Sequence, residues 1–286
     1  MKILLTGASG QVGFELERSL QGLGEVIALD RARMDLADLD QVRSVLRAVR
    51  PGLIVNPAAY TGVDQAETDA ALAFRVNAEA PAVMAAEARA LGAAMVHYST
   101  DYVFNGSKDG AWCETDATDP INVYGRSKLA GEQAVAAAGI PHLILRSSWV
   151  YGMRGKNFLL TMLRLAKERE SLRVVADQFG APTWSRTIAD TSALVLAQAR
   201  AGGDGWWDAH SGIYHLSSGG QTTWCGFTEA IVAAAGLACS VTPISSAEYP
   251  LPARRPRNSV LDTSKLQTAF CTLPDWRTAL ALCMAS

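Results

Sequence analysis

The chain has 286 residues, of which 49% are hydrophobic and 19% are charged, and its formal net charge is −2. This composition is typical of a globular protein that buries a large core. A nearly neutral chain with no long basic run argues against nucleic acid as a partner. No apolar stretch approaches the ~20 residues of a membrane span. Because the first residues have the pattern of a strand, we expect no signal peptide. We expect neither nucleic acid nor a membrane as partner.

The five cysteines are an odd number without a C-x-x-C or a cysteine–histidine metal spacing. This pattern is typical of reduced thiols. We therefore expect a cytoplasmic protein.

The first predicted elements form a dinucleotide site. An apolar strand runs into Gly7, Gly10 and Gly13, spaced G-x-x-G-x-x-G, and a second strand over 26–29 ends before Asp30. Glycines let the backbone approach a pyrophosphate, and the helix expected from Gln11 offers free N–H groups. Asp30 is placed to accept hydrogen bonds from the adenosine ribose. A glycine triplet alone is compatible with an ordinary turn, so the choice between a turn and a dinucleotide site depends on motifs later in the chain.

Strand and helix patterns alternate through the first half. Asp38-Leu39-Asp40-Gln41 resembles a helix cap, and that helix ends before Pro51-Gly52. Strands are predicted at 53–56, 94–99 and 143–147, and helices at 66–91, with an adjustment near Pro81, and at 124–138. This alternation predicts a doubly wound, Rossmann-type α/β fold with a parallel sheet. Ligands of such sheets bind at the carboxyl ends of the strands.

Tyr124 and Lys128 form a Y-x-x-x-K pair on one face of the predicted helix. The ammonium is expected to lower the pKa of the phenol and so to support acid–base chemistry. Such a pair alone is usually a surface contact. Here it follows the glycine motif and a Ser99-Thr100-Asp101 run at the end of a strand.

The second half is less regular. Helices are predicted at 158–169, 188–200, 224–235 and 274–284, a strand end at 174–175, and a glycine-rich loop at 201–212. With no low-complexity linker, we expect this half to pack against the first.

Together these motifs resemble the extended short-chain dehydrogenases/reductases, and within them the dTDP-4-dehydrorhamnose reductase family. The narrower resemblance covers essentially the whole chain. It rests on five strings, HYSTDYVF at 97–104, NVYGRSKLAGE at 122–132, SWVY at 148–151, DQFGAPT at 177–183 and PARRP at 252–256. It implies reduction of the C4 ketone of dTDP-4-dehydro-L-rhamnose by NAD(P)H, the last step of dTDP-rhamnose synthesis, in lipopolysaccharide O-antigen biosynthesis.

The resemblance implies a dinucleotide-binding domain over residues 1–150, with segments near 185–216 returning to it, and a smaller mixed α/β substrate-binding domain over residues 151–286. It also assigns site residues. It implies Tyr124 as proton donor, Lys128 as its partner and a ligand of the nicotinamide ribose, and Thr100 as a second group on the ketone oxygen. The residues expected to bind cofactor are Gly7, Gly10, Gln11, Val12, Asp30, Asp35, Leu36, Ala59, Tyr60, Thr61, Tyr124 and Lys128. Those expected to bind the nucleotide-sugar are Thr100, Asp101, Trp149, Asn157, Gln178 and Arg255.

Cofactor choice and metal binding follow from a few charges. Asp30 favours NADH, whereas Arg31 and Arg33 could neutralise the 2′-phosphate of NADPH, so we expect use of both. Some members of the family dimerise around Mg²⁺. Glu15 stands at the place of one ligand, but Arg186 occupies another, so we predict no metal and leave a homodimer possible.

Two other functions remain open. A nucleotide-sugar epimerase or dehydratase would share Tyr124 and Lys128, but it would retain its cofactor through purification. A non-catalytic, dinucleotide-binding regulatory subunit would have no need of Thr100, Tyr124 and Lys128 together.

Overall fold

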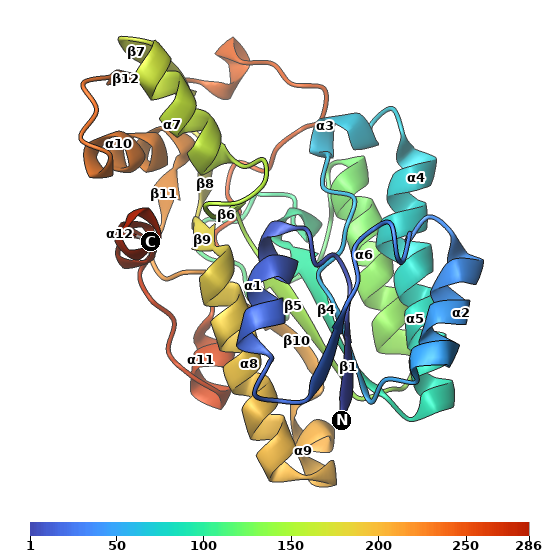
Figure 1. The fold of residues 1–286 in the computed structure, drawn as a ribbon. Coiled ribbons are helices and arrows are strands. Elements are labelled where there is room, and N and C mark those ends of the chain that lie inside the picture. Colours follow the sequence, from blue (N-terminus) through green and yellow to red (C-terminus); the bar gives the residue numbers. More distant parts are fainter. Residues whose placement is uncertain (286) are drawn as a thin grey trace.

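A parallel sheet forms the centre of the protein, for which the computed structural model describes residues 1–285 (Figure 1). Neighbouring strands are all parallel. Their order is β10 (Gly212–His215), β5 (His142–Ser147), β4 (Ala94–Thr100), β3 (Leu53–Asn56), β1 (Lys2–Leu5) and β2 (Glu25–Ala28). The predicted fold class is confirmed.

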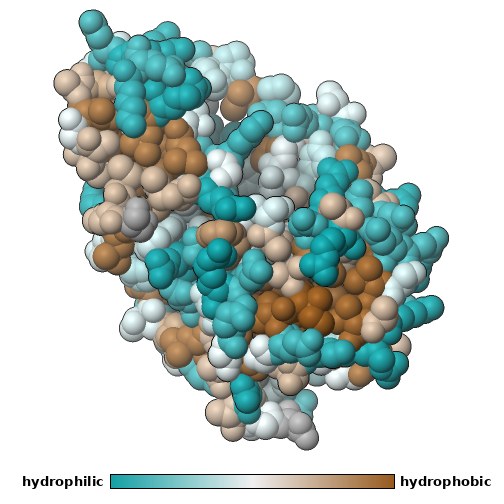
Figure 2. All heavy atoms as spheres, viewed as in Figure 1, coloured by the Kyte–Doolittle hydropathy of each residue, from teal (hydrophilic) through white to brown (hydrophobic). Residues whose placement is uncertain are grey.

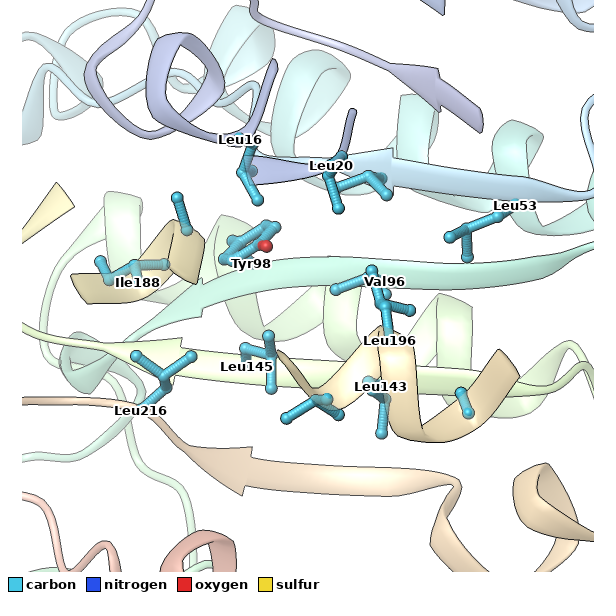
Figure 3. Packing of buried hydrophobic residues seen from close by; sticks show 14 of the residues in the cluster. Leu16, Leu20, Leu53, Val96, Tyr98, Leu143, Leu145, Ile188, Leu196 and Leu216 are labelled. Carbon is cyan, nitrogen blue, oxygen red and sulfur yellow. The ribbon is translucent and has the colours of Figure 1, made fainter. Parts of the chain in front are cut away.

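Helices cover both faces of this sheet, because alternate residues of each buried strand are apolar on opposite sides. Ile3 and Leu5 pack toward one face, which α1 (Gln11–Ser19) and α8 (Ser185–Gly202) cover, whereas Leu4 packs toward the other. That other face is covered by α2 (Leu39–Val49), α5 (Ala80–Leu91) and α6 (Val123–Ala137). Figure 3 shows the first face, with side chains of α1 and α8 meeting those of β4 and β5.

Polar side chains cap the N-termini of two of these helices, α2 and α6. Asp38 accepts hydrogen bonds from the N–H groups of Asp40 and Gln41, as predicted for a cap, and Asn122 accepts one from Gly125 at the start of α6. Both helices thereby lose unpaired N–H groups at their first turn. The cap at Asn122 fixes the start of the helix that carries Tyr124 and Lys128.

The helix predicted over 66–91 is broken into several elements. These are α3 (Val63–Ala66), α4 (Ala70–Phe74), a π-helical turn over Arg75–Glu79 and α5. The π-helical turn lies just before Pro81, whose missing N–H removes an α-helical bond to the carbonyl of Asn77. The adjustment near Pro81 was predicted correctly, but the break between α3 and α4 was missed.

The remaining elements build a second lobe beside the sheet, seen at the upper left of Figure 1. Its helices are α7 (Phe158–Glu168), α10 (Trp224–Ala234) and α12 (Trp276–Met284). The helix α11 (Ser264–Ala269) instead lies beside β10, where its Leu266 joins the core of the first sheet face. The strand pairs of the second lobe are β6 (Val150–Tyr151) with β9 (Thr183–Trp184), β7 (Ser171–Val175) with β12 (Ser240–Ile244), and β8 (Phe179–Gly180) with β11 (Thr222–Thr223). The surface is hollowed between this lobe and the sheet domain (Figure 2).

The loop predicted at 201–212 is wrong. Residues Asp204–His210 form the helix α9, and Gly212 begins β10 at the edge of the sheet. Trp206 explains the error, because its ring packs on His210 and Phe270 within the core of the first sheet face. Tertiary packing thus outweighs the low helix propensity of the neighbouring glycines. Among the described residues, no helix is long and apolar enough to cross a bilayer.

Candidate active site

A cleft of about 590 Å³ opens at the carboxyl ends of the central strands. One side is the glycine loop after β1, and the other is the first turn of α6. The predicted cofactor residues that line it are Gly7, Gly10, Gln11, Val12, Asp35, Leu36, Ala59, Tyr60, Thr61, Tyr124 and Lys128. The cleft therefore gathers segments that lie far apart in the sequence.

The glycine loop has the geometry that a dinucleotide phosphate needs. Gly7 has a φ of 59°, in the left-handed region, and a Cβ there would stand 3.0 Å from the Cβ of Ala58. A Cβ on Gly13 would collide with the carbonyl of Gly7. The first turn of α1 has no side-chain cap and no acidic residue. Its N–H groups and positive dipole end thus face the cleft without a competing anion, which fits a pyrophosphate.

The far end of the cleft contains Arg31, Met34, Asp35 and Leu36. Asp30 is the one predicted cofactor residue that does not line the cleft. Its carboxylate accepts a hydrogen bond of 3.1 Å from the backbone N–H of Arg33. Arg31 lies 3.5 Å from Asp35 and keeps a 78% exposed side chain. A cation and an acid therefore both flank this end.

The structure brings Tyr124, Thr100 and Asp101 together. The Thr100 hydroxyl donates to the Asp101 carboxylate over 2.9 Å. Burial raises the pKa of Asp101 to about 7, against the hydrogen bonds from Ser259 and Thr100. Desolvation raises the pKa of the Tyr124 hydroxyl to about 12, while the neighbouring Thr100 hydroxyl lowers it and the charge of Asp101 raises it further. Tyr124 is therefore protonated at neutral pH.

Lys128 is buried one helical turn after Tyr124, with only 2% of its surface exposed. Its ammonium donates a 2.6 Å hydrogen bond to the carbonyl of Tyr98. Burial lowers the pKa of Lys128 to about 8, and the charge of Glu132 opposes that shift. The expectation that Lys128 lowers the pKa of Tyr124 is wrong for this structure, because desolvation dominates and the pKa of Tyr124 rises.

A second pocket, of about 400 Å³, lies in the other lobe. Its lining includes Gln178, Arg254, Arg255 and Arg257, with Asp177 as its acid. Three guanidinium groups around one hollow are suited to a phosphate-bearing ligand. Gln178 and Arg255, both predicted substrate residues, meet here.

Trp149 and Asn157, also predicted substrate residues, lie outside this pocket. Trp149 has a φ of 46°, strained for a bulky residue, and its ring stacks on that of Trp224 at 3.5 Å. The indole of Trp224 in turn donates to the side chain of Gln178. Asn157 donates a 2.9 Å hydrogen bond to Gln11 at the glycine loop. Asn157 therefore contacts a residue of the first cleft and does not line the pocket of Gln178 and Arg255.

Comparison with known proteins identifies the family of this chain. The family model described as "RmlD substrate binding domain" matches residues 1–286. The chain belongs to this family. A dTDP-4-dehydrorhamnose reductase of Burkholderia thailandensis is 53% identical over 99% of this chain and 98% of its own. The resemblance inferred from the five sequence strings is thereby confirmed.

Solved structures of two relatives share the whole fold. A dTDP-4-dehydrorhamnose reductase of Clostridium acetobutylicum is 35% identical, with a TM-score of 0.92, over 100% of this chain and 99% of that one. The reductase of Bacillus anthracis, in complex with NADP, is also 35% identical, with a TM-score of 0.91, over 99% and 98%. The protein is thus an oxidoreductase of the RmlD substrate binding domain family.

Sequence reasoning missed two buried amides of this family member. Asn77, 1% exposed, holds both backbone groups of Tyr60 and donates to Ser127 on α6. Asn122 caps α6 and also donates to the carbonyl of Arg254 over 2.8 Å. The signals were a proline four residues after Asn77 and an asparagine just before a helix. Both amides brace backbone segments that line the two pockets.

Proposed function

We propose that this protein reduces the C4 ketone of dTDP-4-dehydro-L-rhamnose to dTDP-L-rhamnose, using NADPH or NADH. One observation carries the proposal: Tyr124 and Lys128 line one end of a cleft whose other end suits a dinucleotide, and Thr100 lies beside the Tyr124 hydroxyl. The names of the relatives identify the ketone among the many that such a site could reduce. The product would be the rhamnose donor for polysaccharides such as the O-antigen.

The cofactor is held along the first cleft. The pyrophosphate would meet the N-terminus of α1 at Gly10, Gln11 and Val12, and Asp35 and Leu36 would flank the adenine. Asp30 and Arg31 would compete over the ribose, the acid favouring a 2′-hydroxyl and the cation a 2′-phosphate. Lys128 would bond the nicotinamide ribose. The nicotinamide supplies the hydride when it is bound.

Tyr124 donates the proton. The ketone oxygen gains negative charge as its carbon is reduced, and a positioned acid lowers the barrier to that change. With a pKa of about 12, the phenol is protonated at neutral pH yet more acidic than the alcohol it forms. Thr100 would hold the same oxygen by turning toward it the hydroxyl proton that it donates to Asp101 in this structure.

Each of the two lobes would bind one of the two ligands. Residues 1–150, with the segments near 185–216, hold the dinucleotide, and residues 151–286 hold the nucleotide-sugar. Asp101 and Trp149 would line the sugar end, and Gln178 and Arg255 the nucleotide end. Asn157, which donates to Gln11, would close the substrate lobe over the glycine loop.

Arg255→Ala should raise KM for the dTDP-sugar about tenfold or more, since a hydrogen bond to a charged group contributes roughly 1.5–3 kcal/mol. KM for NADPH should stay the same, because Arg255 lines the second pocket and not the first. Steady-state kinetics with each ligand varied separately measures both. Arg173→Ala is the control, since Arg173 is a 64% exposed arginine of the same lobe that pairs with Glu248. An unchanged sugar KM for Arg255→Ala would remove that pocket from the proposal.

The proposed function itself is tested with enzymatically prepared dTDP-4-dehydro-L-rhamnose. Oxidation of NADPH or NADH that depends on this substrate, with dTDP-L-rhamnose as product, is the expected result. Bound NAD⁺ that survives purification, with no net oxidation, would favour an epimerase or dehydratase. Binding of dinucleotide without any turnover would favour a regulatory subunit.

Independence of Mg²⁺, the homodimer and the cytoplasmic location stay predictions. Two observations bear on the metal. Among the described residues, no group of three or more His, Cys, Asp and Glu side chains is placed to hold a metal ion. Arg186, which stands at the place of a metal ligand in the family, lies 3.8 Å from Asp190 on α8.

A further inference from the structure

Arg255 is tied to the opposite lobe by a carboxylate. Its two terminal nitrogens donate to the two oxygens of Asp64 over 2.9 and 2.8 Å, and Nη1 also donates to the carbonyl of Ala253. The N–H of Ala253 donates to the same carboxylate. Asp64 lies on α3, which follows the cofactor-cleft residues Thr61 and Gly62. One carboxylate therefore fixes both the side chain of Arg255 and the backbone of its loop.

This pairing leaves one edge of the guanidinium unused. Asp64 takes the end-on edge, made by Nη1 and Nη2, so Nε and the second hydrogen of Nη2 remain. Within residues 1–285 these two donors have no protein acceptor among the hydrogen bonds of Arg255. Two parallel donors on the side-on edge match two oxygens of a phosphate. Because Arg255 lines the second pocket, this edge is available to an anion there.

The loop that carries Arg255 is held on several sides. The buried amide of Asn122 donates to the carbonyl of Arg254, and Gly106, with a φ of 82°, packs against Pro256. On the substrate-lobe side, the carbonyl of Arg257 accepts a 2.7 Å hydrogen bond from Phe179. In Figure 1 this orange-red segment reaches from the upper lobe to α3. The backbone is thus fixed, and Asp64 sets the direction of the side chain.

We propose that Asp64 is a positioning residue for substrate recognition: it aims the free edge of Arg255 at the diphosphate of the nucleotide-sugar. The inference rests on the proposed function for the identity of that ligand. Asp64 itself would never touch the substrate, because it lies in the domain that binds the cofactor. Pre-ordering the guanidinium removes the cost of immobilising a flexible side chain when the ligand binds.

The other explanation is that the pair only joins two lobes. The protein offers a matched comparison, since Arg47 and Glu87 form a second two-bond pair, at 2.9 and 2.6 Å, between α2 and α5. That pair lines none of the described pockets. Glu87→Gln thus removes a similar carboxylate without approaching the ligand.

The test compares Asp64→Asn with Glu87→Gln. We expect Asp64→Asn to raise the Kd of dTDP, measured by calorimetry, and KM for the dTDP-sugar about fivefold or more. Values of kcat and of KM for NADPH should stay within about twofold. Glu87→Gln should leave all four values unchanged. A shift in thermal stability without a change in dTDP affinity for Asp64→Asn would overturn the proposal.

A double-variant cycle checks that Asp64 acts through Arg255. If it does, Asp64→Asn added to Arg255→Ala should weaken dTDP binding no further, so the two effects are not additive. Independent, additive losses would contradict the proposed route. Because dTDP binding needs no turnover, the Kd values of dTDP test the role of Asp64 even if the wild-type protein fails to reduce dTDP-4-dehydro-L-rhamnose. Only that failure would count against the proposed function.

Discussion

Tyr124→Phe should lower kcat for ketone reduction by two or more orders of magnitude, in line with the ~10²–10⁴-fold that a positioned acid contributes. The Tyr124 phenol lines the cleft beside Thr100, and its pKa of about 12 keeps it protonated, and therefore neutral and able to donate a proton, throughout the neutral pH range. Phenylalanine keeps the ring and its edge-on contact with Tyr102 at 5.9 Å. Single-turnover oxidation of NADPH measures the chemical step directly.

Tyr151→Phe is the matched control. Tyr151 is fully buried in the second lobe, and its hydroxyl meets no hydrogen-bond partner in the described part of the chain. Its removal should leave kcat unchanged and the fold at least as stable. NADPH affinity should survive in both variants. Activity of Tyr124→Phe above about a tenth of wild type would mean that another group supplies the proton.

The first half of the fold followed from sequence because its signals are local. The glycines at 7, 10 and 13, the Asp38 cap and Pro51-Gly52 each act within a few residues, so the elements they bound were predicted closely. In the break between α3 and α4 lies Glu67, whose carboxylate accepts from the N–H of Val123. Such a contact, 56 residues away, leaves no local pattern.

The candidate site shows the same division. Motif spacing brought Tyr124, Lys128 and Thr100 together, because Lys128 follows Tyr124 by one helical turn and parallel strands end at one edge. Their pKa values were not predictable, since they depend on how deeply each group is buried. Arg255 was predicted as a substrate residue, and it lines the second pocket, but its pairing with Asp64 was not predicted. An ion pair between two lobes has no periodic signature in the sequence.

Glu132→Gln should lower the free energy of unfolding by about 3–5 kcal/mol, the usual cost of leaving one member of a buried ion pair unpaired. Glu132 on α6 accepts two hydrogen bonds, of 2.9 and 2.7 Å, from Arg146 on β5. Their side chains are only 2% and 3% exposed. The pair fastens the catalytic helix to the sheet, and glutamine cannot neutralise the buried guanidinium. Urea unfolding measures the loss.

Replacing both partners separates packing from charge. Glu132→Leu with Arg146→Met should recover most of the lost stability, because buried ion pairs exchange well for apolar groups of similar volume. The pH dependence of kcat/KM should nevertheless differ from that of the wild-type protein. The charge of Glu132 raises the pKa of Lys128, which burial holds at about 8, so without it Lys128 loses its proton at a lower pH. The alkaline limb of kcat/KM should therefore move to lower pH in the stable double variant. An unmoved limb would show that the charge of Lys128 does not govern turnover.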